Sequence, residues 1–180
     1  APGQGGWAAY LAGVLWVLRE AGHQVGAVTL ALTSDVPLGA GLSSSAAIEC
    51  AVMAAVCDLF SLNIAPMERA QLAQRAENVY VGAPTGLLDQ AASTLCRTGH
   101  GLFLDCRTLE TTDVPLPLHD QGFEILVLDT HSPHSHIDGE YGERRATCEQ
   151  AAKILGVRAL RDVTDLDAAL SRLPDTQMRR

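Results

Sequence analysis

The sequence predicts a globular chain in which helices and short strands alternate, and three observations support this class. The hydrophobic fraction of 47% and the charged fraction of 19% are those of a folded chain rather than a disordered one. Residues 7–18 repeat large apolar side chains at helical spacing, whereas residues 24–36 are rich in Val, Leu and Thr and indicate a strand. A length of 180 residues suffices for one domain with a sizeable core, or for one domain and part of a second.

The remaining elements follow the same two patterns. Gly22 ends the first helix, and Pro66 suits the first turn of another. Further helices are predicted at residues 44–60, 66–81, 87–95, 139–155 and 160–173, and further strands at 102–105, 113–118 and 123–129. The connection at residues 119–122 is the predicted domain boundary, which gives domains 1–122 and 123–180.

Charge and cysteine usage limit the function classes. The net charge of −8 argues against a nucleic-acid partner, because such binding depends on clustered Lys and Arg. No apolar run is long enough to span a membrane. The five cysteines form no CxxC pair and fit neither a disulfide framework nor a structural zinc site. They predict small core residues in a reducing cytoplasm, and nothing in the sequence predicts an oligomeric state.

Residues 37–47, PLGAGLSSSAA, have the outline of a phosphate site. Gly39 and Gly41 let the backbone approach a ligand closely and adopt positive φ. The hydroxyls of residues 43–45 then open a helix, whose free N–H groups and dipole favour an anion. No Lys follows the glycines, so the segment is not a Walker A loop. The alternative is a tight turn in which Ser caps a helix.

Glu77 and Asp89 lie at the two ends of a second site, residues 77–90 (ENVYVGAPTGLLDQ). The Gly-x-Pro-x-Gly loop between them can fold back and bring both acids to one place. Phosphoryl transfer needs one acid to orient or deprotonate the attacking hydroxyl, a role that suits Asp89, and another to hold the metal, which suits Glu77. The alternatives are a solvated helix residue for Glu77 and a helix cap for Asp89.

Residues 37–47 resemble the second motif of the GHMP kinases, usually written PxGxGLxSSA, at every defined position. The triple Ser is more similar to galactokinases than to mevalonate or homoserine kinases. The resemblance implies that ATP phosphates bind along residues 39–45, through Gly39, Gly41, Leu42, Ser43, Ser44 and Ser45. It also implies that Ser44 or Ser45 helps to hold Mg²⁺.

Residues 77–90 resemble the galactokinase signature E-x-x-[FY]-x-G-x-P-x-G-x-x-D-Q. The resemblance implies that Asp89 faces the anomeric hydroxyl of the sugar as the catalytic base and that Glu77 binds magnesium. It further implies that the backbone of Gly86 contacts the sugar.

A third resemblance covers residues 129–149, DTHSPHSHIDGEYGERRATCE. Galactokinases carry a similar string, in which a tyrosine that corresponds to Tyr141 contacts the sugar. Ile137 is a mild departure, since Leu is usual there. His131, His134 and His136 have the spacing of a zinc cluster, but only His134 matches the family and no carboxylate or Cys stands convincingly beside them. A solvated loop is the favoured interpretation.

The fold that the resemblance implies is α+β, the GHMP kinase fold. Its first lobe is similar to domain 2 of ribosomal protein S5, and its second is ferredoxin-like and only begun here. Two further galactokinase motifs, similar to GRVNLIGEHTDY and GAGFGGC, are absent from the sequence. We therefore expect a central fragment of a family member.

The expected activity is transfer of the ATP γ-phosphate to the 1-hydroxyl of galactose, with Mg²⁺ as cofactor and galactose and ATP as small-molecule substrates. Two alternatives stay open. One is another kinase of the family, acting on N-acetylgalactosamine, arabinose or mevalonate. The other is a non-catalytic sensor of galactose and ATP, which the intact Glu77, Asp89 and Ser triplet disfavour.

Overall fold

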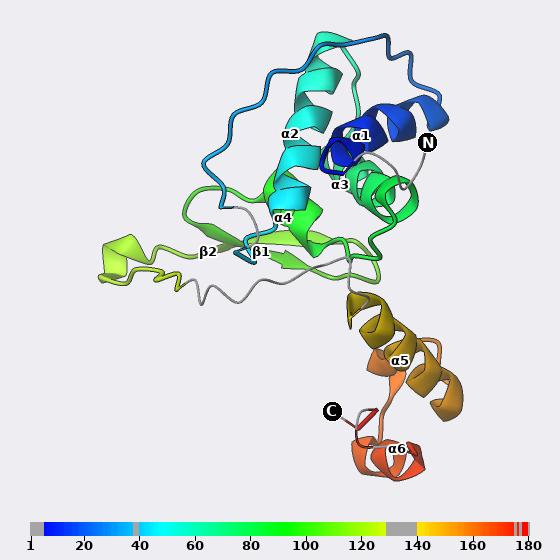
Figure 1. Cartoon of the computed structure of the whole chain (residues 1–180). Helices are drawn as coiled ribbons and strands as arrows, with labels where there is room; N and C mark the ends of the chain where they lie inside the picture. The colour runs from blue at the N-terminus through cyan, green and yellow to red at the C-terminus, as the bar shows by residue number, and fades with distance from the viewer. Residues whose placement is uncertain (1–5, 38–39, 129–139, 175, 177, 180) are drawn as a thin grey trace. The chain divides into compact units, whose positions relative to one another are not determined.

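The structure is a computed structural model, and it describes residues 6–37, 40–128, 140–174, 176 and 178–179 (Figure 1). The chain divides into two compact units, residues 1–135 and 136–180. Each unit is considered by itself.

The first unit consists of packed helices followed by a β-hairpin (Figure 1). Its elements in chain order are α1 (Ala8–Glu20), α2 (Ser44–Leu59), α3 (Pro66–Arg75), the π-helical turn η1 (Ala76–Val81), α4 (Leu88–Leu95), β1 (His100–Leu104), β2 (Thr111–Pro115) and the 3-10 turn η2 (His119–Gln121). The predicted helices at 7–18, 44–60, 66–81 and 87–95 are confirmed, with the difference that the last turn of the third is π-helical.

Apolar side chains from α1, α2 and α3 form the core of the first unit. Val14, Val17 and Leu18 of α1 pack in one buried cluster with Met53 and Val56 of α2. This follows from the helical spacing of the apolar residues, which places them on one face of each helix. Trp16 packs against the same cluster, whereas Trp7 is exposed.

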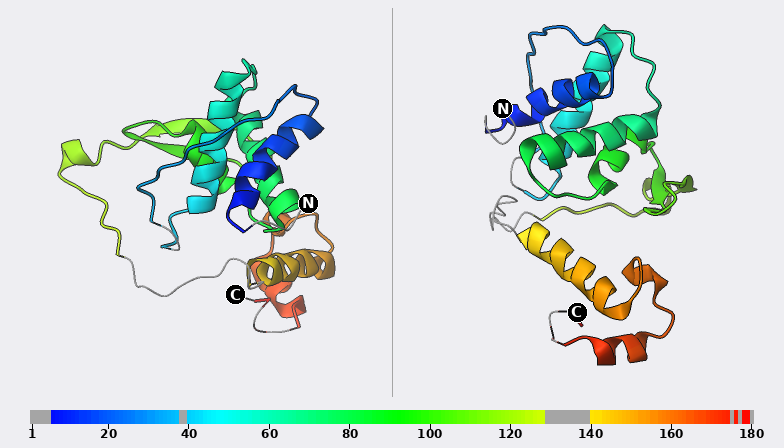
Figure 2. Two further views of the ribbon diagram at one scale, coloured as in Figure 1. Left: turned by 45° about the horizontal axis from the view of Figure 1, so that its top comes forward. Right: turned by 90° about the vertical axis from the view of Figure 1, so that its right-hand side faces the viewer.

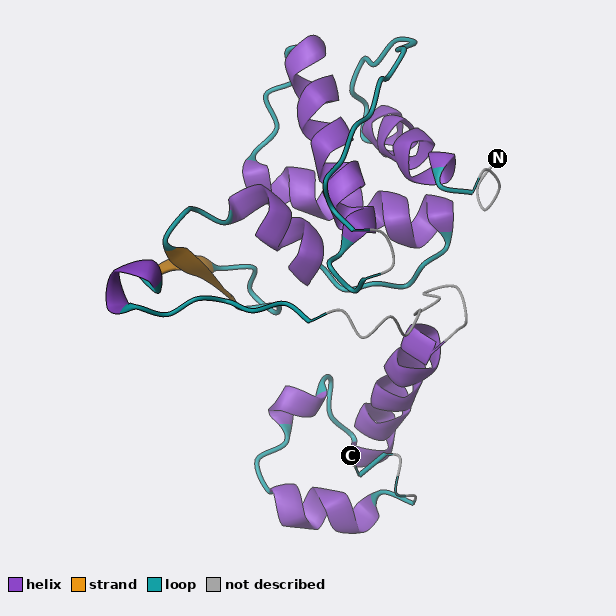
Figure 3. Cartoon of the chain, turned by 60° about the vertical axis from the view of Figure 1, so that its left-hand side comes forward, coloured by secondary structure: helices purple, strands orange, loops and turns teal. Residues whose placement is uncertain are grey.

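The hairpin of β1 and β2 is antiparallel, with His100 opposite Pro115 and Leu104 opposite Thr111 (Figure 3). It confirms the strands predicted at 102–105 and 113–118, displaced by about two residues. The Asp105 carboxylate shapes the turn between the strands, because it accepts hydrogen bonds from the Arg107 N–H (2.7 Å) and the Thr108 N–H (3.2 Å).

The strand predicted at residues 24–36 is wrong. These residues form an extended connection from α1 to α2 and join no sheet (Figure 2). A strand requires a ladder partner, and β1 and β2 are the two strands of the only sheet within the described residues. The Arg19 guanidinium instead donates hydrogen bonds to two carbonyls of the connection, those of Val25 and Gly26, each at 2.9 Å.

The strand predicted at residues 123–129 is also wrong for its described part, residues 123–128. The segment is extended and without a ladder, and its apolar side chains are exposed; Leu126, for example, is 80% exposed. An apolar run is typical of a buried strand. A strand is buried only where neighbouring strands and helices cover it, and the run itself does not determine whether they are present.

The second unit contains α5 (Glu140–Leu155), the 3-10 turn η3 (Leu160–Asp162) and α6 (Leu166–Arg172). The helix predicted at 139–155 is confirmed, while the one predicted at 160–173 is divided in two. The division follows from two acids: Asp162 accepts from the Ala159 N–H and closes η3, and Asp165 accepts from the Ala168 N–H and caps α6.

Candidate functional site

The segment before α2 has the backbone conformation that a close ligand approach requires. Gly41 has φ +72°, and no atom lies within 4 Å of a Cβ built there. Ser43, the residue before the helix, is also left-handed at φ +53°. Of the other predicted phosphate-binding residues, Leu42 is exposed, Ser44 and Ser45 are half-buried, and Gly39 lies outside the described residues.

The first turn of α2 is open to an anion. The hydroxyl of Ser43 makes no capping hydrogen bond, and the first turn carries no acidic side chain. The first intrahelical bond runs from the Ala47 N–H to the Ser43 carbonyl, at 3.0 Å. The N–H groups of the preceding turn therefore have no partner within the helix, and they add to the positive end of its dipole.

Glu77 sits in the π-helical turn η1, where the chain changes direction. Its carbonyl accepts from the N–H groups of both Gly82 (3.0 Å) and Ala83 (3.1 Å). Gly82 closes the turn with φ +91°, a conformation that L side chains rarely adopt. Single π-helical turns inside helices are frequent at functional sites.

The Glu77 side chain is buried, 3% exposed, so it is not a solvated helix residue. Its Oε2 accepts two short hydrogen bonds, from Thr85 Oγ1 at 2.8 Å and from Gln90 Nε2 at 2.6 Å. Both bonds reach the same oxygen, and Oε1 accepts neither of them. A buried carboxylate held in this way is oriented rather than mobile.

The loop after Glu77 folds back as its glycines and proline predict. The Thr85 N–H donates to Asn78 Oδ1 at 2.8 Å, and the Asn78 amide donates to the Thr85 carbonyl at 3.3 Å. These two hydrogen bonds hold the loop in its folded-back conformation, and α4 follows it. Gly86 and Asp89 are both exposed there, with Asp89 in the first turn. The N-cap of α4 is Leu87, so Asp89 is not the helix cap.

Glu49 and Gln90 are site residues that our sequence analysis missed. Both are 0% exposed, and Gln90 Nε2 also donates to Glu49 Oε2 at 3.4 Å. Burial, followed by the nearby charge of Glu77, raises the pKa of Glu49 to about 9. The spacing of Glu49 with the apolar Val52, Met53 and Val56 places it on the buried face of α2, and this is the signal that could have found it.

The structure thus brings together part of the predicted set. Gln90, the residue after Asp89, is hydrogen-bonded both to Glu77 of η1 and to Glu49 of α2. Glu49 lies one helical turn after Ser45. Tyr141 lies in the first turn of α5, in the other unit, and its side chain falls outside the described part of the chain. His131, His134 and His136 also lie outside the described residues.

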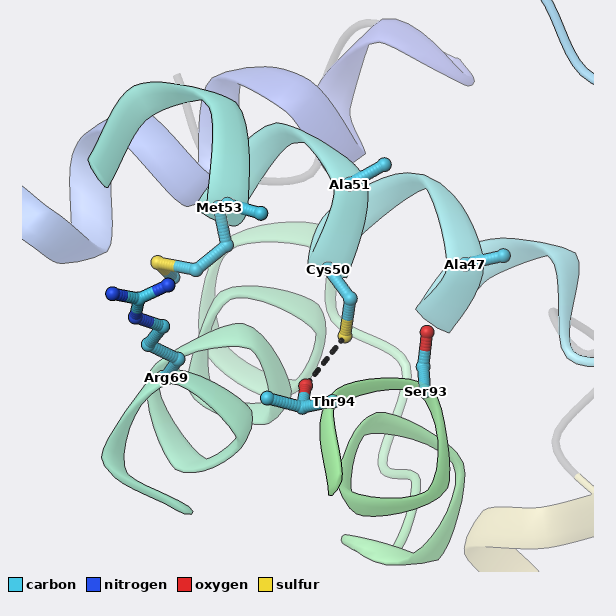
Figure 4. Close-up of a pocket in the computed structure, with 8 residues that line it drawn as sticks. Ala47, Cys50, Ala51, Met53, Arg69, Ser93 and Thr94 are labelled. Carbon is cyan, nitrogen blue, oxygen red and sulfur yellow. Dashed lines mark hydrogen bonds between the residues drawn. The ribbon is translucent and has the colours of Figure 1, made fainter. Parts of the chain in front are cut away.

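A separate pocket of about 330 Å³ opens between α2, α3 and α4 (Figure 4). Thr94 Oγ1 donates to Cys50 Sγ in this pocket at 3.5 Å, and none of the predicted site residues lines it. The lining residues are Ala47, Cys50, Ala51, Met53, Ala54, Arg69, Ser93 and Thr94.

Three general expectations can be compared with the described residues. Within them no helix is long and apolar enough to cross a membrane. Across the same residues, no three His, Cys, Asp or Glu side chains gather in a way that could hold a metal ion. All five cysteines are free. Cys57 is buried and Cys50 half-buried, whereas Cys96, Cys106 and Cys148 are exposed, so the prediction of core residues is wrong for these three.

Comparisons with known proteins agree with the predicted resemblance. The family model for the GHMP kinases N terminal domain matches residues 9–97. A galactokinase of Streptomyces coelicolor is 55% identical over 95% of this chain and 45% of its own length. A galactokinase of Mycobacterium bovis is 48% identical over 97% of this chain and 48% of its own length.

A solved structure gives the same result for the fold. The galactokinase of Lactococcus lactis, crystallised with galactose, superposes with a TM-score of 0.80 and 28% sequence identity, over 96% of this chain and 47% of that one. The α+β class and the GHMP kinase fold are therefore confirmed. The chain spans about half the length of the relatives it matches. Residues 9–97 therefore carry a GHMP kinases N terminal domain, and along most of its length the chain is a homologue of the galactokinases.

Proposed function

We propose that this chain carries the phosphoryl-transfer site of a galactokinase, which moves the γ-phosphate of ATP to the 1-hydroxyl of galactose. The observation that carries the proposal is the pair of hydrogen bonds from Gln90 to Glu77 and Glu49, because they join the second predicted motif to α2, the helix that begins within the first. The 55% and 48% identities to galactokinases support galactose as the acceptor.

The start of α2 would bind the triphosphate of ATP. Gly41 leaves room for the phosphates, and the first-turn N–H groups of the helix donate to their oxygens. The absence of an acid from that turn favours an anion there. Gly39, Leu42 and the hydroxyls of Ser43 to Ser45 belong to the same proposal.

The donor set fits Mg²⁺, which prefers hard oxygen ligands and is usually held by one or two carboxylates together with substrate phosphates. Glu77 would hold the ion through Oε1, since Oε2 already accepts two hydrogen bonds. Ser44 or Ser45 would add a hydroxyl oxygen. When bound, Mg²⁺ neutralises the charge that develops on the transferred phosphate.

Asp89 would orient or deprotonate the 1-hydroxyl of galactose. It is exposed at the start of α4, immediately before the buried Gln90, so its backbone is fixed while its carboxylate stays accessible. The exposed Gly86 would let the main chain approach the sugar. The role of Tyr141 as a sugar contact is proposed from the resemblance alone. Positioning supplies much of the rate in this chemistry.

We further propose a nucleotide-binding lobe at residues 1–122, the start of the second lobe at 123–180, and a cytoplasmic location.

The test of the function is ADP release with galactose, N-acetylgalactosamine, arabinose or mevalonate as acceptor. The proposal requires release with galactose to exceed release with the other three. Preference for another acceptor would assign a different kinase of the family, and binding of galactose and ATP without release would assign a sensor.

A further inference from the structure

We propose that Gln90 is a positioning residue that fixes the Glu77 carboxylate for metal binding, and that Glu49 in turn fixes Gln90. This inference rests on the proposed function, because it concerns how Glu77 would hold the ion. It adds two residues that touch neither substrate in the proposed mechanism.

Gln90 is held from both sides. Its side-chain amide is completely buried and donates to Glu77 Oε2 at 2.6 Å and to Glu49 Oε2 at 3.4 Å. A side-chain amide has two N–H donors, and here both carboxyl partners lie on the Nε2 side. Rotating the amide by half a turn would place Oε1 against the Glu77 carboxylate, so the two acceptors fix its orientation.

As a consequence, the two oxygens of the Glu77 carboxylate have different roles. Oε2 accepts from Gln90 and also from Thr85 Oγ1 at 2.8 Å, which satisfies that oxygen. Oε1 accepts neither bond and is left for a cation. Hydrogen bonds of this kind, made to a metal ligand rather than to the metal, set the direction and basicity of the ligand.

The same residue ties Glu77 to the helix that begins at the phosphate loop. The Gln90 carbonyl accepts from Cys50 Sγ at 3.7 Å, while its side chain contacts Glu49. Two adjacent residues of α2 therefore hold Gln90, one by its backbone and one by its side chain. Ser45 lies one helical turn before Glu49, so metal ligand and phosphate loop share one rigid connection.

One further feature shows that this cluster is more than packing. Glu49 Oε1 and Gln90 Oε1 are buried without a hydrogen-bond partner among the described residues. Apolar side chains of similar volume would avoid that cost, because unpaired buried polar groups destabilise a fold. A cluster retained only for packing would not need these oxygens, whereas a cluster that orients Glu77 needs the Gln90 donor and an acceptor that holds it.

The test is the affinity of the chain for Mn²⁺ in the presence of ATP, followed by the electron paramagnetic resonance signal of free Mn²⁺ and measured against the same titration without the chain, because ATP itself binds Mn²⁺. Gln90→Met keeps the side-chain length but removes the donor, and we expect it to weaken Mn²⁺ binding by roughly tenfold or more. Binding of metal-free ATP should change by less than about twofold, because Gln90 lies outside the phosphate loop. Unchanged Mn²⁺ affinity in folded Gln90→Met would overturn the inference.

Variants of Glu49 test the same connection from its other end and keep the inference testable if Gln90→Met does not fold. Glu49→Gln retains an oxygen acceptor for Gln90, so we expect its Mn²⁺ affinity to stay within about threefold of the wild type, whereas Glu49→Met should weaken binding further. Equal Mn²⁺ affinities for the two variants would contradict the proposed role of Glu49.

Val56→Ala is the control for general loss of stability. Val56 is a buried core residue on α2, two helical turns after Glu49, and its apolar side chain cannot hydrogen-bond in the carboxyl cluster, so this variant should unfold more easily and bind Mn²⁺ normally. An equal loss of Mn²⁺ affinity in Val56→Ala would overturn the inference. A wild-type chain that binds no Mn²⁺ with ATP would overturn the proposed function together with it, which separates the two failures.

Discussion

Glu49 and Glu77 are buried carboxyl groups on different elements that share a single hydrogen-bond donor, the side-chain amide of Gln90. The sharing is unequal: Glu77 is held at 2.6 Å and Glu49 at 3.4 Å. Two carboxylates in one buried site cannot both be charged without cost, and burial together with the charge of Glu77 raises the pKa of Glu49 to about 9.

The first prediction concerns stability and pH. The folded state holds the Glu49 proton far above the ordinary pKa of 4.5, so between pH 4.5 and about 9 it binds more protons than the unfolded state. The free energy of unfolding should therefore fall as pH rises through this range, by up to about 1.4 kcal/mol per pH unit. Urea unfolding at pH 6 and pH 8.5 measures the effect.

Glu49→Gln removes the titrating proton and should flatten this pH dependence, whereas Glu20→Gln changes an exposed residue and should leave it as in the wild type. A pH dependence that persists unchanged in Glu49→Gln would show that Glu49 does not carry it.

The second prediction concerns the hydroxyl of Thr85. Thr85→Val removes the 2.8 Å hydrogen bond to Glu77 Oε2 and should lower the free energy of unfolding by about 1–2 kcal/mol. Thr94→Val is the matched control, because that hydroxyl donates only to a thiol sulfur at 3.5 Å, and it should cost less than about 0.5 kcal/mol. Equal losses from the two variants, measured in urea, would contradict a special role for Thr85.

The third prediction compares two glycines of the same loop. Gly82 has φ +91°, so Gly82→Ala should destabilise the chain by about 1–2 kcal/mol. Gly86 lies outside the left-handed region and has no atom within 4 Å of a Cβ built on it, so Gly86→Ala should change stability by less than about 0.5 kcal/mol. Thermal unfolding distinguishes them, and similar melting temperatures for the two variants would be the contrary result.

The fourth prediction concerns galactose binding by Gly86→Ala, a substitution that the fold should tolerate. If its backbone faces the sugar, as proposed, the added methyl group of Gly86→Ala should weaken galactose binding by about tenfold or more while the fold stays intact. Isothermal titration with galactose measures this. Wild-type affinity in Gly86→Ala would place the sugar elsewhere.

The helices could be predicted from the sequence because their signals are local. The spacing of Val14, Val17 and Leu18, and the proline at position 66, specify helices without reference to the rest of the chain. The strands at 24–36 and 123–129 were predicted wrongly because a strand depends on partners distant in sequence, which a periodicity cannot supply.

The candidate site was predictable in part for the same reason. The loops around Gly41 and Gly82 follow from glycine chemistry, and both have positive φ in the structure. The roles of Glu49 and Gln90 depend on contacts among α2, η1 and α4, and Gln90 is 41 residues from Glu49 and 13 from Glu77 along the chain. The π-helical turn at Glu77 had no signal in the sequence pattern, which continued as an ordinary helix.

The most direct test of the central claim is galactose-dependent ADP release with Mg²⁺ and ATP, compared between the wild type and Asp89→Asn. The account predicts that Asp89→Asn lowers turnover by about a hundredfold or more while ATP binding is retained, because the amide cannot accept the hydroxyl proton. Galactose-dependent turnover that survives nearly intact in Asp89→Asn would contradict the account.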